Sequence, residues 1–186
     1  MVFFYSLCLP YLNFIMHLMT IIPSLPEDLD KIFELYDEAT RFQKTKTSFY
    51  WMPFSRTMVE QEILEGRQFK IMDNEKIAGI FAITNSDELI WKEKNIQPSI
   101  YLHRIVIADN YKGKNLLDAV IDWAVDFSKS NHLKYVRLDT FADNKKLVNY
   151  YIKSGFALID IVTMENSEAL PPHYNNAKLA LLEIKI

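Results

Sequence analysis

The stretch 106–120, VIADNYKGKNLLDAV, holds the end of a strand, a polar turn and the start of a helix. Alternating residues predict a strand that ends at Ala108. The polar turn 109–114 leads directly into apolar residues at helical spacing over 114–130. The free N–H groups of a helix N-terminus and the positive end of its dipole form an anion site, and two lysines in the turn add positive charge. This arrangement suits a pyrophosphate.

Patterns on both sides of this junction predict further strands and helices. Alternating or continuous apolar runs bounded by turn residues predict strands over 20–22, 68–72, 76–84, 99–108, 133–139, 156–164 and 177–186. Helical spacing predicts helices from Ser24 onward and over 55–65, 114–130 and 144–153. The order of these elements indicates a mixed α/β fold in one layered domain.

The composition is typical of a globular domain. The chain has 186 residues, of which 49% are apolar and 24% charged, which is enough for a core without disulfides or a structural metal. The formal net charge of −3 argues against a general nucleic-acid binder. Cys8 is the only cysteine, so an intramolecular disulfide and a zinc cluster are excluded. We therefore expect a reducing, cytoplasmic location and no nucleic-acid partner.

Several common motifs are absent from the sequence. The 4 glycines lie too far apart for a dinucleotide-binding fingerprint. A P-loop is missing because Gly113-Lys114 is followed by Asn115. The 4 histidines show no metal-ligand spacing, and there is no serine nucleophile elbow. We expect no metal site, which leaves the anion site of the turn as the main chemical feature.

An apolar extension, residues 1–18, precedes a domain that we place at 19–186. Three interpretations remain open: a dispensable extension with the physiological start at Met19, a membrane-associating segment, or a part of the fold. A signal peptide needs a positive N-terminal region, but the first basic residue is Lys31. Pro10 interrupts the run and weakens a spanning helix. We expect no membrane partner.

Two segments carry motifs that lie in register with each other. Residues 111–117 read YKGKNLL, and later the chain has an Asn, a Tyr seven residues on, and a Gly-Phe pair, at Asn144, Tyr151, Gly155 and Phe156. Together with 137–140 they resemble the GNAT superfamily of acyl-CoA-dependent N-acetyltransferases. The resemblance covers 19–186. It implies one GNAT-like domain, with a central, mostly antiparallel, twisted sheet of six to seven strands flanked by about four helices.

The resemblance also implies acetyl-CoA as co-substrate and a set of residues that hold it. The pantetheine arm would lie beside the strand that ends at Ala108, and the backbone amides of 113–118 would hold the pyrophosphate. The implied cofactor-binding residues are Ile105, Val106, Ile107, Lys112, Gly113, Lys114, Asn115, Leu116, Leu117, Asp118 and Asn144.

Two side chains are the implied catalytic groups. Tyr151 matches the family's general-acid tyrosine, whose pKa near 10 exceeds that of a thiol. His103 is our choice of base, because imidazole titrates near neutral pH; a water chain is the alternative. The serotonin-type members carry histidines at the positions of Tyr101 and His103. The alternative to a catalytic role is a packing role: Tyr151 would then be a core tyrosine and His103 a buried structural histidine.

The acceptor pocket would be built from the start of the first helix and two loops, 49–54 and 170–175. The expected substrate-binding residues are Tyr50, Trp51, Tyr101, His173 and Tyr174. Their rings fit an acceptor with an apolar or cationic part. Equally, they could pack as a lid over the sheet.

The resemblance thus implies an N-acetyltransferase that transfers acetyl directly to a primary amine of a small molecule or peptide. Its sheet edges are compatible with a homodimer. Lys112, Asn115 and Leu117 depart from the family's Arg or Gln, Gly, and Gly or Ala. These departures keep open a second hypothesis, a non-catalytic GNAT-fold module that binds CoA or another ligand.

Overall fold

The computed structural model describes residues 19–46 and 50–186; the predicted extension 1–18 and Phe49 of the aromatic loop lie outside this part. Seven strands form one sheet in the order β1-β2-β3-β4-β5-β7-β6. Neighbouring strands run antiparallel, except for the parallel pair β4 and β5. The strands are β1 (Met19–Pro23), β2 (Gln68–Asp73), β3 (Lys76–Thr84), β4 (Ser99–Ile107), β5 (Tyr135–Phe141), β6 (Ala157–Thr163) and β7 (Lys178–Lys185).

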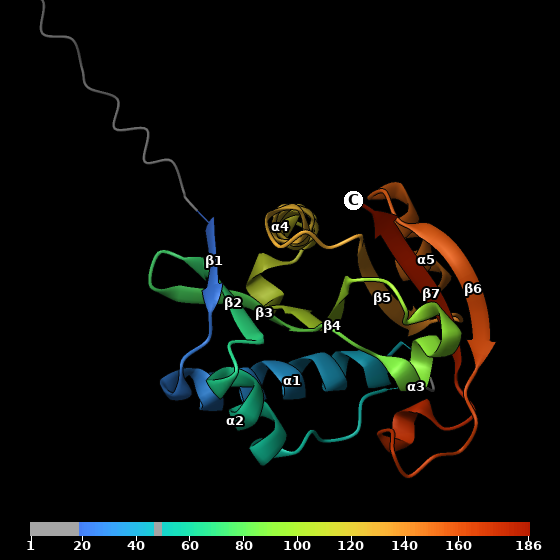
Figure 1. Cartoon of the computed structure of the whole chain (residues 1–186). Helices are drawn as coiled ribbons and strands as arrows, with labels where there is room; N and C mark the ends of the chain where they lie inside the picture. The colour runs from blue at the N-terminus through green and yellow to red at the C-terminus, as the bar shows by residue number, and fades with distance from the viewer. Residues whose placement is uncertain (1–18, 47–49) are drawn as a thin grey trace, which may run out of the picture.

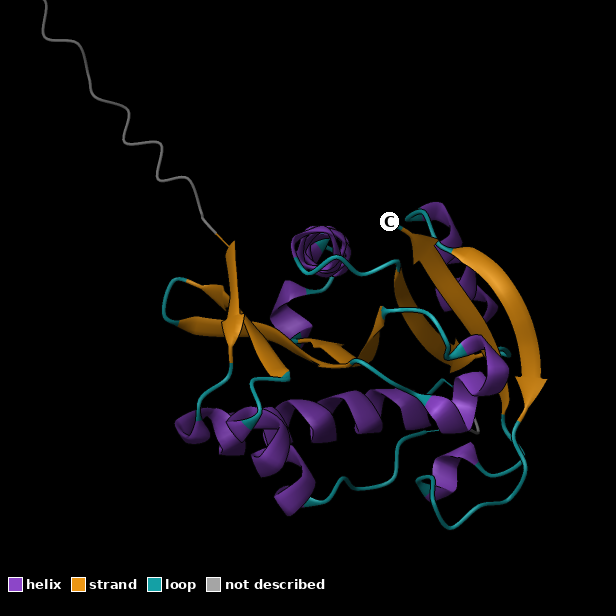
Figure 2. Cartoon of the chain, in the orientation of Figure 1, coloured by secondary structure: helices purple, strands orange, loops and turns teal. Residues whose placement is uncertain are grey.

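Helices cover both faces of the sheet. Helices α1 and α2 lie on one face and α4 on the other (Figure 1). Residues 50–55, which lead into α2, and the connection from β6 to β7 lie on the α1 side (Figure 2). The helices are α1 (Leu29–Lys44), α2 (Arg56–Leu64), α3 (Glu88–Trp91), α4 (Leu116–Ser130) and α5 (Lys145–Lys153), with a short 3-10 helix η4 (Pro172–Tyr174) before β7.

The predicted mixed α/β fold and element order are confirmed. The α-helix that the described residues add to the predicted ones is α3, which is too short for a helical period to show in the sequence. It begins after Asp87 and ends at Lys92, whose φ of 46° leaves the helical region. None of the helices within 19–46 and 50–186 has the length and apolar character needed to cross a bilayer.

A β-bulge interrupts the expected alternation of β4. Ile80 pairs with Val106 and Ala82 with His103, so two residues of β4 stand opposite one residue of β3. The bulge contains Arg104, whose φ is 49°. Our expectation that 101, 103, 105 and 107 share one face is therefore wrong beyond His103, because a bulge shifts the period-two phase.

The Arg104 side chain lies on the face of the sheet that α1 and α2 cover. Its Nε donates to the Tyr36 hydroxyl of α1 at 3.1 Å, and its guanidinium also pairs with Glu62 of α2. The Arg104 side chain is 15% exposed and that of Glu62 6%. These bonds connect β4 to both α1 and α2.

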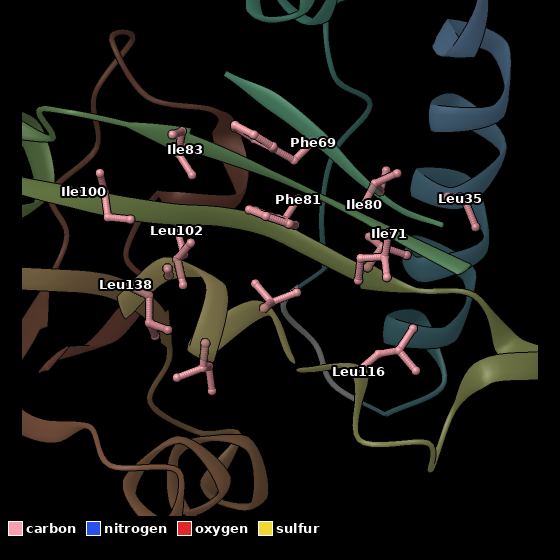
Figure 3. Close-up of a cluster of buried hydrophobic side chains, with 14 of the residues drawn as sticks. Leu35, Phe69, Ile71, Ile80, Phe81, Ile83, Ile100, Leu102, Leu116 and Leu138 are labelled. Carbon is pink, nitrogen blue, oxygen red and sulfur yellow. The ribbon is translucent and has the colours of Figure 1, made fainter. Parts of the chain in front are cut away.

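The core joins the sheet to helices on both faces. Leu35 of α1 and Leu116 of α4 belong to the same buried cluster as Ile71, Phe81 and Leu102 (Figure 3). Phe69 and Phe81 stack with ring centroids 5.3 Å apart. Full burial of one such aliphatic side chain contributes roughly 1.5–3 kcal/mol.

Gly79 sets how closely β3 approaches β4. A Cβ at this position would lie 2.7 Å from the backbone oxygen of Val106 and 3.0 Å from side-chain atoms of Ile71 and Ile107. We expect Gly79→Ala to lower the free energy of unfolding by about 1–3 kcal/mol, because the backbone oxygen must move. Chemical denaturation measures this, with the exposed Lys76→Ala on the same strand as control. An unchanged midpoint would show that β3 and β4 can separate without cost.

Candidate active site

A cavity of about 510 Å³ opens where β4 and β5 part. The two strands are paired in register only from Ser99↔Tyr135 to Tyr101↔Arg137. Beyond this point residues of both strands line the cavity. Further walls come from α1, the loop before α2, the starts of α4 and α5, and η4. The cavity therefore extends from the predicted anion site to the two predicted acceptor loops.

The turn before α4 adopts the unusual backbone angles that its sequence allows. Gly113 has a φ of 81° and Asn115 a φ of 57°. Asparagine tolerates this left-handed conformation, so the departure from glycine at 115 is accommodated. The helix starts at Leu116, and helix geometry leaves the amides of its first turn without intrahelical acceptors. These amides are the donors predicted for a pyrophosphate.

The two lysines of the turn differ in their position relative to the cavity. Lys112 lines the cavity, pairs with Asp109 and lies 4.0 Å above the Phe42 ring. Lys114 instead lies 4.5 Å from the ring of Tyr111. Lys112 is thus the better placed of the two cations.

Three other predicted cofactor residues differ in what they can offer. Leu116 is a core residue, 4% exposed. The Asp118 carboxylate accepts hydrogen bonds from Tyr150 and Ser154, at 2.8 and 3.0 Å. Leu116 and Asp118 can therefore serve a ligand through their backbone amides. Leu117 lines the cavity with its side chain.

The predicted pantetheine residues lie along the same cavity. Ile105, Val106 and Ile107 line it from β4, and Asn144 lines it from the start of α5. Asn144 Oδ1 accepts the Leu147 amide at 3.2 Å as the N-cap of α5. Its amide nitrogen remains the group that could donate to a ligand.

Tyr151 lies at the wall of the cavity, from α5. It is 6% exposed, and its ring packs edge-on to Phe156 with centroids 5.6 Å apart. Burial, and next the negative charge of Asp139, raise the pKa of the Tyr151 hydroxyl above its ordinary value near 10. The hydroxyl therefore stays protonated at neutral pH. Its packing role and the predicted acid role are compatible.

His103 faces a carboxylate but is shielded from water. Its Nε2 lies 3.7 Å from Asp87 Oδ2. Burial, reinforced by the positive charges of Arg104 and Arg67, lowers the pKa of His103 to about 3. The imidazole is therefore neutral at pH 7 and can accept a hydrogen bond there.

Asp139 is the acidic side chain that sequence reasoning did not single out. It lies on β5, two residues beyond the last pair of the β4–β5 ladder, as His103 does on β4. Burial and the charge of Asp87 raise the pKa of Asp139 to about 7, and the Tyr174 hydroxyl interacts with it. Burial also raises the pKa of Asp87 to about 6. The available signal was a carboxylate inside a predicted strand.

The two predicted acceptor loops meet at the cavity. Trp51, His173 and Tyr174 all line it. The backbone N–H of Met52 donates to His173 Nδ1 at 3.3 Å, which joins the loops directly. Burial lowers the pKa of His173 to about 4, so this ring is neutral at pH 7.

Two predicted substrate residues lie elsewhere. The Tyr50 ring lies below Lys44, 4.9 Å from its ammonium group, outside the cavity lining. Tyr101 is 1% exposed; its hydroxyl donates to Asn95 Oδ1 at 2.5 Å and accepts from Arg137 at 2.9 Å. These bonds hold Tyr101 outside the cavity lining, so its predicted substrate contact stays a prediction.

Comparisons with known proteins agree with this geometry. Residues 27–156 match the model of the Acetyltransferase (GNAT) family. The chain is 23% identical over 142 residues to the "Uncharacterized N-acetyltransferase YesJ" of Bacillus subtilis (strain 168), covering 72% of this chain and 79% of that protein.

Solved structures show the same fold. A GNAT-family acetyltransferase from Listeria monocytogenes superposes with a TM-score of 0.72 at 21% identity, covering 90% of this chain and 95% of that one. A spermidine N-acetyltransferase from Vibrio cholerae in complex with CoA and spermine gives 0.65 at 19% identity, covering 90% and 95%. The ribosomal-protein-S18-alanine N-acetyltransferase of Escherichia coli gives 0.65 at 15% identity, covering 91% and 94%. With the family model matching most of its length, this chain belongs to the GNAT family of acetyltransferases.

Proposed function

We propose that the protein transfers the acetyl group of acetyl-CoA to the primary amine of a small molecule or peptide. The carrying observation is that one cavity joins the α4 turn, the opening between β4 and β5, and a group of titratable side chains. A spermidine and a ribosomal-protein alanine N-acetyltransferase share the fold, which supports an amine acceptor. Cytoplasmic location and a homodimer stay predictions.

The residues present fit acetyl-CoA. The first-turn amides of α4 and the cation of Lys112 suit a pyrophosphate, and Asn144 and the edge of β4 suit an amide-rich arm. Leu117 lines the cavity without filling it. The departure at 117 is therefore compatible with acetyl-CoA binding.

When bound, acetyl-CoA supplies an activated acetyl thioester. An attacking amine must be neutral, so a group of the protein or a water has to take its proton. His103 was the predicted base, but its pKa of about 3 makes it a weak one. Asp139, with a pKa of about 7, is better matched to neutral pH. Tyr151 would donate its hydroxyl proton to the departing sulfur.

Titration of acetyl-CoA into the full-length protein tests the co-substrate. We expect micromolar binding by isothermal calorimetry. Replacing Lys112 by Met should weaken it by about three- to tenfold, since one charge-assisted contact is lost. Lys153→Met, on α5, is the matched control. Absence of binding at millimolar acetyl-CoA would instead favour the non-catalytic module.

Tyr151→Phe tests the acid. We expect kcat to fall by about 10²–10⁴-fold while the Kd for acetyl-CoA stays within about twofold, because only the proton donor is removed. The neighbouring Tyr150→Phe should keep its turnover. Equal turnover of Tyr151→Phe and wild type would leave Tyr151 as a packing residue.

The pH profile tests Asp139 as the base. A base acts when deprotonated, so kcat/KM should rise tenfold per pH unit below about 7 and level off above it. Asp87, His103, Tyr151 and Tyr174 face this carboxyl and set its titration. In Asp139→Asn the step near pH 7 should disappear, and only the limb from the amine's own ionisation should remain. Persistence of the step would assign it to another group.

A further inference from the structure

Two carboxyl groups meet beside His103, near the point where β4 and β5 part. Asp87 is the N-cap residue of α3, and Asp139 lies on β5. One carboxylate oxygen of each lies within 4.8 Å of the other and of a ring nitrogen of His103. We call Asp87 and Asp139 the carboxyl pair. The fold thus places a second acid beside the residue that we propose as the base.

The two members of the carboxyl pair differ in their access to the cavity. Asp139 lines the cavity, whereas Asp87 is not among the lining residues. The Asp87 side chain is 11% exposed, and its Oδ2 atom is buried with no hydrogen-bond partner among the residues that the structure describes. A substrate in the cavity can therefore reach Asp139, and Asp87 can influence the reaction only through Asp139.

The basic groups beside the pair do not neutralise it. His103 Nε2 lies 3.7 Å from Asp87 Oδ2. Burial, reinforced by the charge of Arg104, lowers the pKa of His103 to about 3, so the imidazole brings no positive charge at pH 7. The guanidinium of Arg104 is itself paired with Glu62. The carboxyl pair therefore stands as two acids in a buried space.

Two acids at this distance cannot ionise independently. A like charge within about 4–6 Å disfavours the ionised form of its neighbour. Burial raises the pKa of Asp87 to about 6, and burial together with the charge of Asp87 raises that of Asp139 to about 7. The pair consequently loses its two protons in sequence, and the titration belongs to both members.

The other titratable groups that face the pair are tyrosine hydroxyls. Tyr101 and Tyr174 act on Asp87, and Tyr151 and Tyr174 act on Asp139. Burial raises the pKa of all three hydroxyls, so they stay protonated and uncharged at neutral pH. The charge beside Asp139 that changes as the pH approaches neutrality is therefore that of Asp87.

We propose that Asp87 is a positioning residue for acetyl transfer: its ionised carboxylate keeps the proton on Asp139 up to neutral pH and so sets the pH above which Asp139 acts as a base. The inference rests on the proposed function and deepens it. In the reaction, the proton of the attacking amine goes to Asp139, while Asp87 keeps its charge and exchanges nothing with the substrate. The short helix α3 thereby has a role, because it brings Asp87 into the interior.

Direct titration of Asp139 in the full-length protein tests the proposal without acetyl-CoA or an acceptor. Labelling aspartate with ¹³C at the carboxyl carbon gives an NMR signal for each aspartate, and the signal lost in Asp139→Asn is that of Asp139. We expect a wild-type midpoint of about 7. In Asp87→Asn this midpoint should fall by roughly one pH unit, because the neighbouring charge is removed while the side chain keeps its shape.

Two further variants separate the charge of Asp87 from its packing. Asp87→Glu retains the charge and should keep the Asp139 midpoint near its wild-type value. Glu88→Gln removes an exposed carboxylate from the next position of the chain and should leave the midpoint unchanged. Thermal melts establish that each variant is folded, and Asp87→Ser, which also suits an N-cap, replaces Asp87→Asn if that one is not.

The midpoints decide the proposal. An Asp139 midpoint that is the same in Asp87→Asn and in the wild type overturns it. A midpoint that falls as far in Asp87→Glu as in Asp87→Asn also overturns it, because the effect would then come from packing.

Activity and cofactor binding separate this inference from the proposed function. With n-butylamine as acceptor, Asp87→Asn should move the step in kcat/KM to lower pH by as much as the NMR midpoint moves. A step that stays in place while the midpoint moves overturns the role of Asp87 in the reaction. A shifted midpoint in a protein that fails to bind acetyl-CoA would overturn the acetyltransferase and keep the coupling within the carboxyl pair. Acetyl-CoA binding with an unshifted midpoint would do the reverse.

Discussion

The separation of two parallel strands is the constraint on which this site depends. Arg137 sits at the last pair of the β4–β5 ladder and donates to the Tyr101 hydroxyl at 2.9 Å, the Lys94 carbonyl at 2.7 Å and Glu183 at 3.0 Å. These bonds join β4, β5 and β7 immediately before the strands part. The cavity therefore opens at a fixed place in the centre of the sheet.

That location explains the chemistry of the side chains that enter the opening. Burial disfavours charge, so it raises the pKa of Asp87 and Asp139 and lowers that of His103. The carboxyls are moved toward neutral pH, which is where a group that exchanges protons is most useful. Holding such groups in the interior is unfavourable for folding alone.

Much of the fold was predictable because its signals are local. The strand, turn and helix at 106–120 appear where the sequence places them, and Gly113 and Asn115 adopt the positive φ that their residue types permit. The short helix α3 was missed because four residues show no period. The residues of β4 that follow His103 were assigned to the wrong faces of the sheet. A bulge inserts one residue into the strand, and nothing distinct in the sequence indicates where it does so.

The sequence by itself determined most of the elements, their order, the turn predicted to bind an anion and the motif positions of Asn144 and Tyr151, since periodicity and turn chemistry act over a few residues. Only the tertiary structure decided which side chains meet. Asp87, His103 and Asp139 come from separate elements, and they converge because strand register and the parting of β4 from β5 place them together. Register depends on pairing between distant segments, and pKa shifts depend on the burial that follows, so neither can be obtained from local pattern.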